Sequence, residues 1–236
     1  MQVLGIIPAR GGSKGIKYKN IAELGDKPLI QYTINSCAKS KNLSNFIVST
    51  DDKRIAEISK DCGAKVPFLR PNELANDNSS SFSVVKHAAE FFKTKFEIQY
   101  DAYMLLQPTT PFRDDNLIDN SIAKLKKNPS ATSVISVVNV ESNHPFRMYT
   151  LNNGEYMKSL INGDFDPMEP RQNLPNIYIR SGDIYLTTFK TLFEENSLIG
   201  SLPIGIKVNP KKAINIDTEI DLEVARAILK GDKWNF

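Results

Sequence analysis

The chain has 236 residues, a length that fits one large α/β domain with a small insertion. Hydrophobic residues make up 41% and charged residues 24%, as is ordinary for a globular protein, and a formal net charge of +3 is too small to indicate a nucleic-acid partner. No stretch approaches the roughly 20 apolar residues of a membrane span, and the N-terminus shows neither a basic region nor a small-residue cleavage site. We therefore expect a cytoplasmic protein without a membrane partner.

Strands and helices alternate from the N-terminus. Val3–Pro8 is apolar without polar alternation, which is typical of a strand in a parallel sheet that is covered on both faces. The next predicted elements are a helix over Pro28–Ser40, a strand over Asn45–Thr50, a helix over Lys53–Cys62 and a short strand over Lys65–Leu69. Gly63, directly after the second helix, is the residue type expected at a helix C-terminus.

The alternation continues through the middle of the chain. A helix is predicted over Ser81–Phe96, because apolar residues recur there at helical spacing: Phe82, Val85, Ala89, Phe92 and Phe96. Tyr103–Leu106 is the fourth predicted strand. Asp114 is expected to cap the following helix, which ends before Pro129, and Ser133–Val140 is the fifth strand.

The pattern breaks between about Asn143 and Asn176. This segment is rich in Asn, Gly and Pro and lacks helical periodicity, so we expect an inserted hairpin or arm. The elements predicted after it are a strand over Ile177–Thr187, a short helix over Phe189–Asn196, strands over Ile204–Val208 and Ala213–Ile216, and a helix that runs to about Lys230. Thr218 with Asp221 forms a capping-box pattern at the start of that last helix.

Strand–helix alternation of this kind predicts a doubly wound, mostly parallel sheet in a single α/β domain over residues 1–236. The ligands of such sheets bind at the carboxyl ends of the strands. Cys37 and Cys62 lie inside predicted helices and match no metal-ligand spacing, so we expect both thiols to be reduced.

The segment from Arg10 to Asn20 follows the first strand and concentrates residues that suit an anion. Within eleven residues it holds three glycines, one serine and four basic side chains. Glycines let backbone N–H groups approach an anion, and basic side chains neutralise its charge. The spacing matches neither G-x-x-x-x-G-K-[ST] nor G-x-G-x-x-G. A solvated basic turn is the alternative, but this many charges directly after a buried strand favour a polyphosphate ligand.

The same loop resembles the nucleotide-binding loop of the CMP-N-acylneuraminate synthetases, whose relatives activate 3-deoxy-manno-octulosonate (KDO). Further motifs of that family recur in the same order: Gln107-Pro108-Thr109-Thr110-Pro111-Phe112-Arg113, Arg171-Gln172-Asn173-Leu174-Pro175 with Gly182-Asp183-Ile184-Tyr185, and Ile214-Asn215-Ile216-Asp217-Thr218. The resemblance covers nearly the whole chain. It implies a nucleotide-diphospho-sugar transferase-like, Rossmann-like fold in which the inserted arm, at about 143–176, forms a homodimer.

The resemblance also implies which residues bind the substrates. The CTP phosphates would be held by Arg10, Gly11, Gly12, Ser13, Lys14, Lys19 and Asn20, and the cytidine by Arg70, Ser79 and Ser81. The alternative for Arg70, Ser79 and Ser81 is that they form an ordinary turn and helix cap. The sugar acid would contact Gln107, Arg147, Arg171 and Tyr185. An arginine presents a planar fork that suits a carboxylate, although Arg147 also fits a surface residue of the arm.

A divalent metal, Mg²⁺, is the cofactor that the resemblance implies. In the family, two aspartates one residue apart on a short strand hold it. Here Asp217 is present, whereas Asn215 replaces the first aspartate and is a weaker ligand because its amide carries no charge. Ser181 and Asp183 also depart from the family pattern, and Asp183 is a candidate to compensate for Asn215.

The leading hypothesis is an N-acylneuraminate-type cytidylyltransferase. It would transfer CMP from CTP to the anomeric hydroxyl of a nonulosonic acid, such as N-acetylneuraminate or legionaminate, with the catalytic residues Arg10, Lys14, Lys19 and Asp217. His87 and His144 are poorly placed to act as a base. The alternatives are an enzyme of the same fold for KDO or GTP, and a nucleotide-binding protein with impaired turnover.

Overall fold

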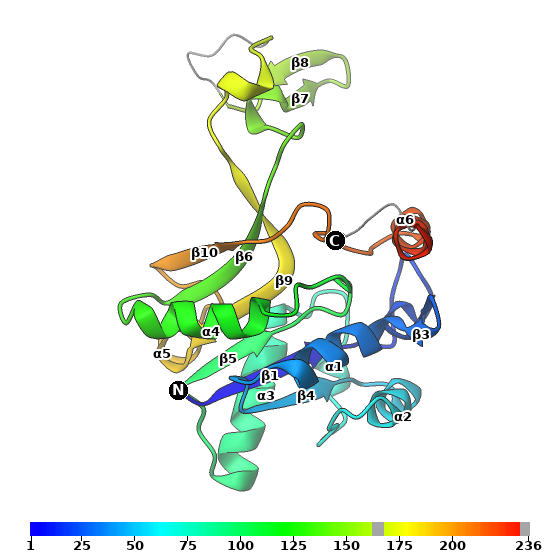
Figure 1. Cartoon of the computed structure of the whole chain (residues 1–236), viewed down its shortest axis with the longest axis vertical. Coiled ribbons are helices and arrows are strands. Elements are labelled where there is room, and N and C mark those ends of the chain that lie inside the picture. Colours follow the sequence, from blue (N-terminus) through cyan, green and yellow to red (C-terminus); the bar gives the residue numbers. More distant parts are fainter. Residues whose placement is uncertain (162–167, 232–236) are drawn as a thin grey trace.

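Six strands form the central sheet, in the spatial order β10-β6-β9-β5-β1-β4 (Figure 1). The computed structural model describes residues 1–161 and 168–231. The strands are β1 (Val3–Pro8), β4 (Asn45–Ser49), β5 (Ala102–Leu105), β6 (Ser133–Asn139), β9 (Tyr178–Thr188) and β10 (Pro203–Lys207). β1 runs parallel to β4 and β5, and β10 runs parallel to β6, whereas β9 is antiparallel to both of its neighbours. The prediction of a mostly parallel sheet is confirmed.

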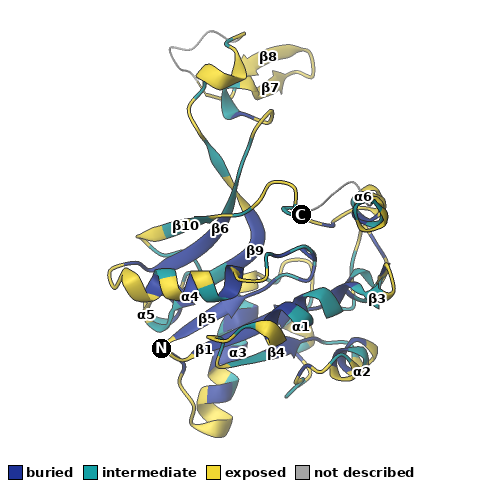
Figure 2. Ribbon diagram, in the orientation of Figure 1, coloured by how far each residue is buried: buried dark blue, intermediate teal, exposed yellow. Residues whose placement is uncertain are grey.

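Helices cover both faces of this sheet (Figures 1 and 2). The three that share one hydrophobic cluster are α1 (Leu29–Lys39), α2 (Lys53–Asp61) and α4 (Leu117–Lys127). The cluster on the opposite face contains α3 (Ser81–Phe96) and α5 (Phe189–Phe193). This arrangement confirms the doubly wound α/β fold.

The apolar central strands contribute side chains to both of these clusters. Along β1, Val3 and Ile7 belong to the cluster of α1, α2 and α4, whereas Leu4 and Ile6 belong to that of α3 and α5. Successive side chains of a strand point to opposite faces, so a strand covered on both sides is apolar throughout. Full burial of one such aliphatic side chain contributes roughly 1.5–3 kcal/mol.

A third, smaller cluster packs α6 (Glu219–Lys230) beside the basic loop. It joins Leu222 and Ala225 of α6 to Ile216, to Leu24 in the short pair β2 (Glu23–Leu24) and β3 (Lys27–Pro28), and to Leu29. The predicted capping box opens α6, with Thr218 at the N-cap and Asp221 at the third helical position. These contacts hold the segment around Asp217 against the loop after β1.

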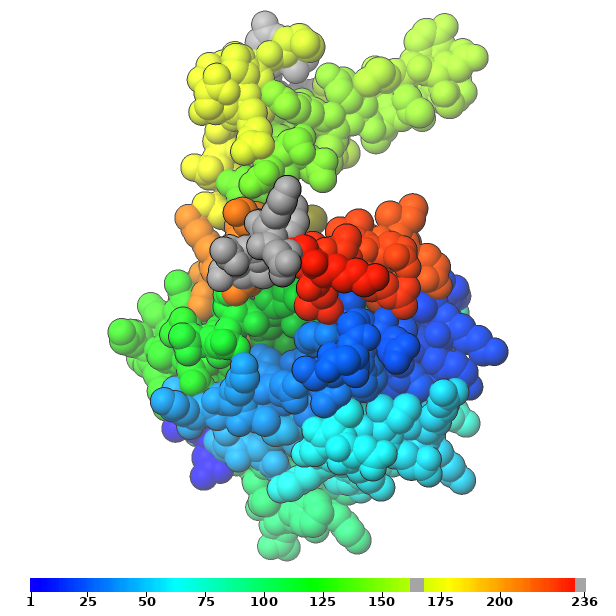
Figure 3. All heavy atoms as spheres, turned by 45° about the vertical axis from the view of Figure 1, so that its right-hand side comes forward, coloured from blue at the N-terminus to red at the C-terminus, as the bar shows by residue number. Residues whose placement is uncertain are grey.

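The inserted arm rises from the ends of β6 and β9 and stands away from the sheet (Figures 1 and 3). It contains an antiparallel hairpin of β7 (Tyr149–Asn152) and β8 (Tyr156–Ser159) between two 3₁₀ turns, η3 (Pro145–Arg147) and η4 (Arg171–Asn173). The prediction of an inserted hairpin is confirmed. Residues 162–167 of the predicted segment lie outside the described residues.

Several predicted elements differ in the structure. Lys65–Leu69 makes only two isolated bridges with the strand beside it, because Pro67 has no N–H to donate to a ladder. Ala213–Ile216 is irregular and is held by loop contacts, among them Ile216 N to Thr109 O at 2.8 Å. The prediction of a strand is wrong in both cases.

Two smaller predictions about helices are also wrong. Asn116, not Asp114, occupies the N-cap of α4, and the Asp114 carboxylate instead contacts Lys212 Nζ at 2.7 Å. The helical spacing places Phe96 on the core-facing stripe of α3, but Phe96 is the last residue of that helix and 51% of its surface is exposed. Cys37 and Cys62 are free thiols, as expected. No helix in the described ranges is long and apolar enough to cross a bilayer.

Candidate functional site

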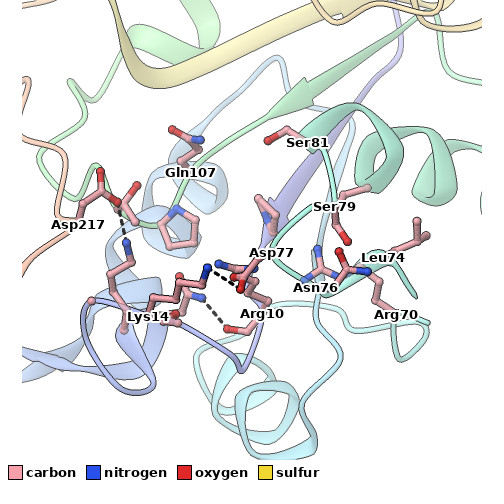
Figure 4. A pocket seen from close by; sticks show the side chains of 18 of the residues that line it. Arg10, Lys14, Arg70, Leu74, Asn76, Asp77, Ser79, Ser81, Gln107 and Asp217 are labelled. Carbon is pink, nitrogen blue, oxygen red and sulfur yellow. Dashed lines mark hydrogen bonds and ion pairs between the residues drawn. The ribbon is translucent and has the colours of Figure 1, made fainter. Parts of the chain in front are cut away.

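A cavity of about 490 Å³ lies at the carboxyl ends of β1 and β5 (Figure 4). It brings together segments that are far apart in the sequence: the basic loop after β1, the stretch from Arg70 to Ser81, the loop after β5 and the segment before α6. Eleven residues that the sequence predicts for the site line it: Arg10, Ser13, Lys14, Lys19, Asn20, Arg70, Ser79, Ser81, Gln107, Asn215 and Asp217. The edge of the sheet predicted to bind ligands therefore does carry a polar cavity.

The basic loop is held in shape by its own amides. Asn20 is buried, and its Nδ2 donates to Arg10 O at 3.0 Å, which closes the loop on itself. Gly11 and Gly12 do not line the cavity. Gly11 N–H donates to Asp51 Oδ1 at 3.1 Å, and a Cβ at this position would lie 2.9 Å from a carboxylate oxygen of Asp52. Gly11 thus lets the loop pack against the end of β4, a role different from the predicted contact with phosphate.

Lys19 faces the segment that was expected to bind metal. Its Nζ lies 2.8 Å from Asp217 Oδ1, and Asn215 Nδ2 contacts the other carboxylate oxygen of Asp217. The two side chains are adjacent although their segment forms no strand. A Cβ on Gly15 would lie 2.3 Å from Asp217 O, so only a glycine allows the basic loop to approach this closely. The loop cation, the carboxylate and the amide therefore form one cluster.

Asp77 is a member of the site that the sequence did not indicate. Its carboxylate lies 2.9 Å from Arg10 Nη1 and 2.8 Å from Lys14 Nζ (Figure 4). The hydrogen bond from Lys14, followed by the contact with Arg10, lowers the pKa of Asp77 below its usual value. An aspartate in a polar loop has no distinctive sequence pattern, so only the folded chain reveals this contact.

Arg70 is buried at the edge of the cavity and fixed by one carboxylate. Its Nη2 lies 3.6 Å from Asp51 Oδ1, and its backbone N–H donates to Thr50 O at 2.7 Å. Burial lowers the pKa of this arginine, and the contact with Asp51 opposes the shift. Arg70 Nε lacks a hydrogen-bond partner among the described residues, so the guanidinium keeps donor capacity beside the cavity.

Three of the four residues predicted to contact the sugar acid do not line this cavity. Arg147 donates to Glu169 O at 3.0 Å, and Arg171 lies 3.6 Å from Glu141, so both belong to the arm. Arg147 borders a second cavity of about 760 Å³ at the base of the arm. Tyr185 packs against the hydrophobic cluster of α3 and α5. Only Gln107 of the predicted sugar contacts lies at the first cavity.

Three further titratable side chains lie away from the cavity lining. Asp183 is buried and accepts from Ser181 Oγ at 2.6 Å, so it does not compensate for Asn215. His144 Nε2 contacts Pro175 O at 3.0 Å inside the arm, and His87 packs edge-on against Phe68. Neither histidine borders the cavity, and that neither acts as a base stays a prediction.

The profile of a family described as cytidylyltransferase matches residues 4–155. The chain is 32% identical over 231 residues to the CMP-N,N'-diacetyllegionaminic acid synthase of Legionella pneumophila, covering 98% of this chain and 97% of that one. It is also 32% identical over 232 residues to a pseudaminic acid cytidylyltransferase of Campylobacter jejuni, with 98% and 97% covered. An N-acylneuraminate cytidylyltransferase of Escherichia coli is 31% identical over 96% of this chain, which spans only 52% of that relative.

Solved structures share the fold at lower sequence identity. A CMP:2-keto-3-deoxy-manno-octonic acid synthetase in complex with CTP superposes with a TM-score of 0.70 at 19% identity, over 97% of this chain and 98% of the other. A 4-diphosphocytidyl-2C-methyl-D-erythritol synthase superposes with a TM-score of 0.68 at 12% identity, with 97% and 98% covered. These two similarities concern the arrangement of the sheet and helices.

Proposed function

Because the chain belongs to the cytidylyltransferase family, we propose that it transfers CMP from CTP to the anomeric hydroxyl of a nonulosonic acid and releases pyrophosphate. The observation that carries the proposal is the cavity that the basic loop, Arg70, Gln107 and the Asp217 cluster line together. The acceptor class follows from the relatives that share about 30% identity, since they are named for legionaminic, pseudaminic and N-acylneuraminic acids.

The cations of the basic loop would bind the triphosphate. In the reaction, the anomeric oxygen of the sugar forms a bond to the α-phosphorus of CTP, the bond from that phosphorus to the bridging oxygen breaks, and the hydroxyl proton is lost. Such transfers need orientation and neutralised charge more than covalent help from the protein. Arg10, Lys14 and Lys19 supply positive charge along one side of the cavity, where they would hold the phosphates and offset the charge that builds up on pyrophosphate.

The residues at Asp217 fit a Mg²⁺ ion that takes most of its ligands from substrate. The Asp217 carboxylate is the anionic ligand that the chain offers, and Asn215 contacts it through Nδ2, so its amide would have to turn to present the oxygen to a metal. No group of three acidic, histidine or cysteine residues gathers within residues 1–161 and 168–231. Mg²⁺ is commonly bound by one or two carboxylates together with phosphates and water. When bound, the ion would neutralise phosphate oxygens, and Lys19 would add its charge beside it.

A homodimer formed through the arm is the second part of the proposal. Large apolar side chains project from the hairpin into solvent, including Leu151, Tyr156 and Met157, and the last two are 73% and 64% exposed. Exposed apolar patches of this kind mark contact surfaces with other proteins. In such a dimer, the arm of one copy would bring Arg147 or Arg171 near the cavity of the other copy. That cavity has Gln107 as its own predicted sugar contact. Light scattering that detects only monomers would contradict the dimer.

The function is tested by pyrophosphate release. The purified chain is incubated with CTP, Mg²⁺ and, in separate reactions, N-acetylneuraminate, legionaminate, pseudaminate and KDO, with GTP replacing CTP as the control. Release is expected with CTP and at least one nonulosonate. Release with none of the nonulosonates, or with KDO alone, would overturn the proposal.

One observation favours a second candidate, a nucleotide-binding protein with impaired turnover: Asn215 stands where the resemblance to the family implies a carboxylate. Calorimetry separates the two candidates. CTP binding without pyrophosphate release in the natural chain, together with release by Asn215→Asp, would support impaired turnover. Release by the natural chain would exclude it.

A further inference from the structure

The Gln107 side chain rests on a glycine that has no space for a side chain. A Cβ added to Gly182 would lie 2.7 Å from Gln107 Oε1 and 3.4 Å from Thr110 Cγ2. Contacts under about 3 Å are essentially never made by real Cβ atoms, so one of these groups would have to move. Gly182 also has a φ of +88°, a conformation that side chains disfavour. The position of the Gln107 amide therefore depends on a backbone 75 residues further along the chain.

An irregularity in β9 brings this glycine to Gln107. Tyr185 pairs with Ile135, and Arg180 pairs with Val137, so β9 advances five residues while β6 advances two. The extra residues between these pairs bulge out of the ladder. A bulge of this kind bends the strand and re-aims its residues, often next to a site. The Ser136 hydroxyl fills the gap, because it accepts from Ile184 N at 2.9 Å and donates to Ile184 O at 3.2 Å.

A buried arginine joins the bulge to the Gln107 loop. Arg113 Nε and Nη2 donate to Asp183 O at 3.2 and 3.0 Å, and Nη2 also donates to Gln107 O at 3.1 Å. Its Nη1 donates to Thr33 Oγ1 of α1 at 3.3 Å. The Arg113 guanidinium thus connects the main chain at Asp183 to the main chain at Gln107. The separation of these two segments determines how closely the Gln107 side chain approaches Gly182. A lysine has a single ammonium and lacks this fork of donors.

We infer that Arg113 and the Ser181–Ile184 bulge are positioning elements that set the orientation of the Gln107 amide, and that Gly182 is required because any side chain there displaces it. The inference rests on the proposed function, in which Gln107 contacts the sugar acid. The bulge does not line the cavity, so it acts on the sugar through Gln107 and leaves the CTP residues in place.

The test compares two glycines that have similar backbone strain and different surroundings. Gly63 has a φ of +91° and nothing within 4 Å of an added Cβ, so Gly63→Ala controls for the strain in Gly182→Ala. We expect Gly182→Ala to raise the KM for the nonulosonate about tenfold or more, since small misplacements at a site have large effects, and to change the KM for CTP less than about twofold. Gly63→Ala should change neither KM.

A double-mutant cycle assigns the effect to Gln107. In a Gln107→Ala background, where no amide remains to be displaced, adding Gly182→Ala should raise the sugar KM less than about twofold further. An equal rise in both backgrounds, or an equal rise in the KM for CTP, would overturn the inference. Arg113→Lys provides a second route if Gly182→Ala does not fold, and it should raise the sugar KM in the same selective way. Absence of turnover in the natural chain contradicts the proposed function itself, whereas turnover with an unchanged sugar KM in folded variants contradicts only the positioning role.

Discussion

At the scale of single residues, the cations of the basic loop already have carboxylate partners. Arg10 and Lys14 share Asp77, and Lys19 contacts Asp217. A phosphate that binds Arg10 and Lys14 has to displace Asp77, because the same donors cannot fully serve both anions. The apparent affinity for CTP is therefore lowered by competition from Asp77 for these two cations.

Removing the competing carboxylate should strengthen CTP binding. Asp77→Asn keeps the size of the side chain but loses its charge, and we expect the KM for CTP to fall about two- to fivefold, a modest effect because the pair is exposed to solvent. The gain should shrink at high salt, which screens exposed pairs. An unchanged or higher KM at low salt would show that Asp77 helps to hold the nucleotide.

The buried carboxyl of Asp183 should make the stability of the folded chain depend on pH. Burial raises the pKa of this carboxyl above its usual 3.8, and Arg113 and the Ser181 hydroxyl oppose the shift. The folded chain thus holds this proton more tightly than the unfolded chain, so the contribution of Asp183 to stability is complete below about pH 3.8 and declines as pH rises through the raised pKa. Asp183→Asn keeps an acceptor for Ser181 and does not ionise. Its Tm minus that of the natural chain should increase with pH over this interval; a constant difference would contradict the assignment.

At the scale of elements, the start of α6 anchors the segment that carries Asp217. Asp221 Oδ2 accepts from Asp217 N at 3.0 Å and from Thr218 N at 2.7 Å. These backbone bonds lower the pKa of Asp221, with the one from Asp217 first. The capping box therefore does more than begin a helix, since it also fixes the backbone of the expected metal ligand.

Loss of this cap should affect both stability and catalysis. Asp221→Ala is expected to lower the free energy of unfolding by about 0.5–2 kcal/mol, the usual range for a helix cap, and to lower kcat because Asp217 is held less firmly. Glu223→Ala on the exposed side of the same helix is the matched control and should stay within about 0.5 kcal/mol. Denaturant unfolding and pyrophosphate release measure the two effects. Equal losses in both variants would show that the cap has no special role.

At the scale of the whole molecule, the residues predicted to contact the sugar lie in two separate parts of the fold, the arm and the end of the sheet. Gln107 lies at the cavity, whereas Arg147 and Arg171 lie in the arm, which stands away from the sheet (Figure 3). Its exposed apolar hairpin has the character of a contact surface. The proposed dimer would cover that surface.

A charge placed on the hairpin should dissociate the proposed dimer. Tyr156→Asp is expected to reduce the mass in solution from twice 26.5 kDa to 26.5 kDa, measured by light scattering at micromolar concentration. Ile220→Asp is the control, because this apolar side chain is equally exposed but lies on α6. Dissociation by Ile220→Asp alone would place the contact surface on α6 instead of the arm.

The features that the sequence predicted well are those with local causes. The bounds of Val3–Pro8 and Ser81–Phe96 matched the structure, and the capping box formed as expected, because apolar period and cap residues act within a few positions. The basic loop was recognisable for the same reason, since its charges and glycines are consecutive. The strand predicted at Lys65–Leu69 failed for a cause that is also local, because Pro67 lies inside that segment and has no N–H to donate to a ladder beside β4.

Taken alone, the amino-acid sequence determined the α/β class, the inserted arm, the basic loop and, through its motifs, the family. Only the tertiary structure decided which carboxylate faces the basic loop, what supports Gln107, and that Tyr185 packs against the core instead of lining the cavity. Asp77 is more than sixty residues from Arg10 in the chain, and Gly182 is 75 residues from Gln107. Such contacts arise from the packing of strands and loops, which places side chains together irrespective of their distance along the sequence.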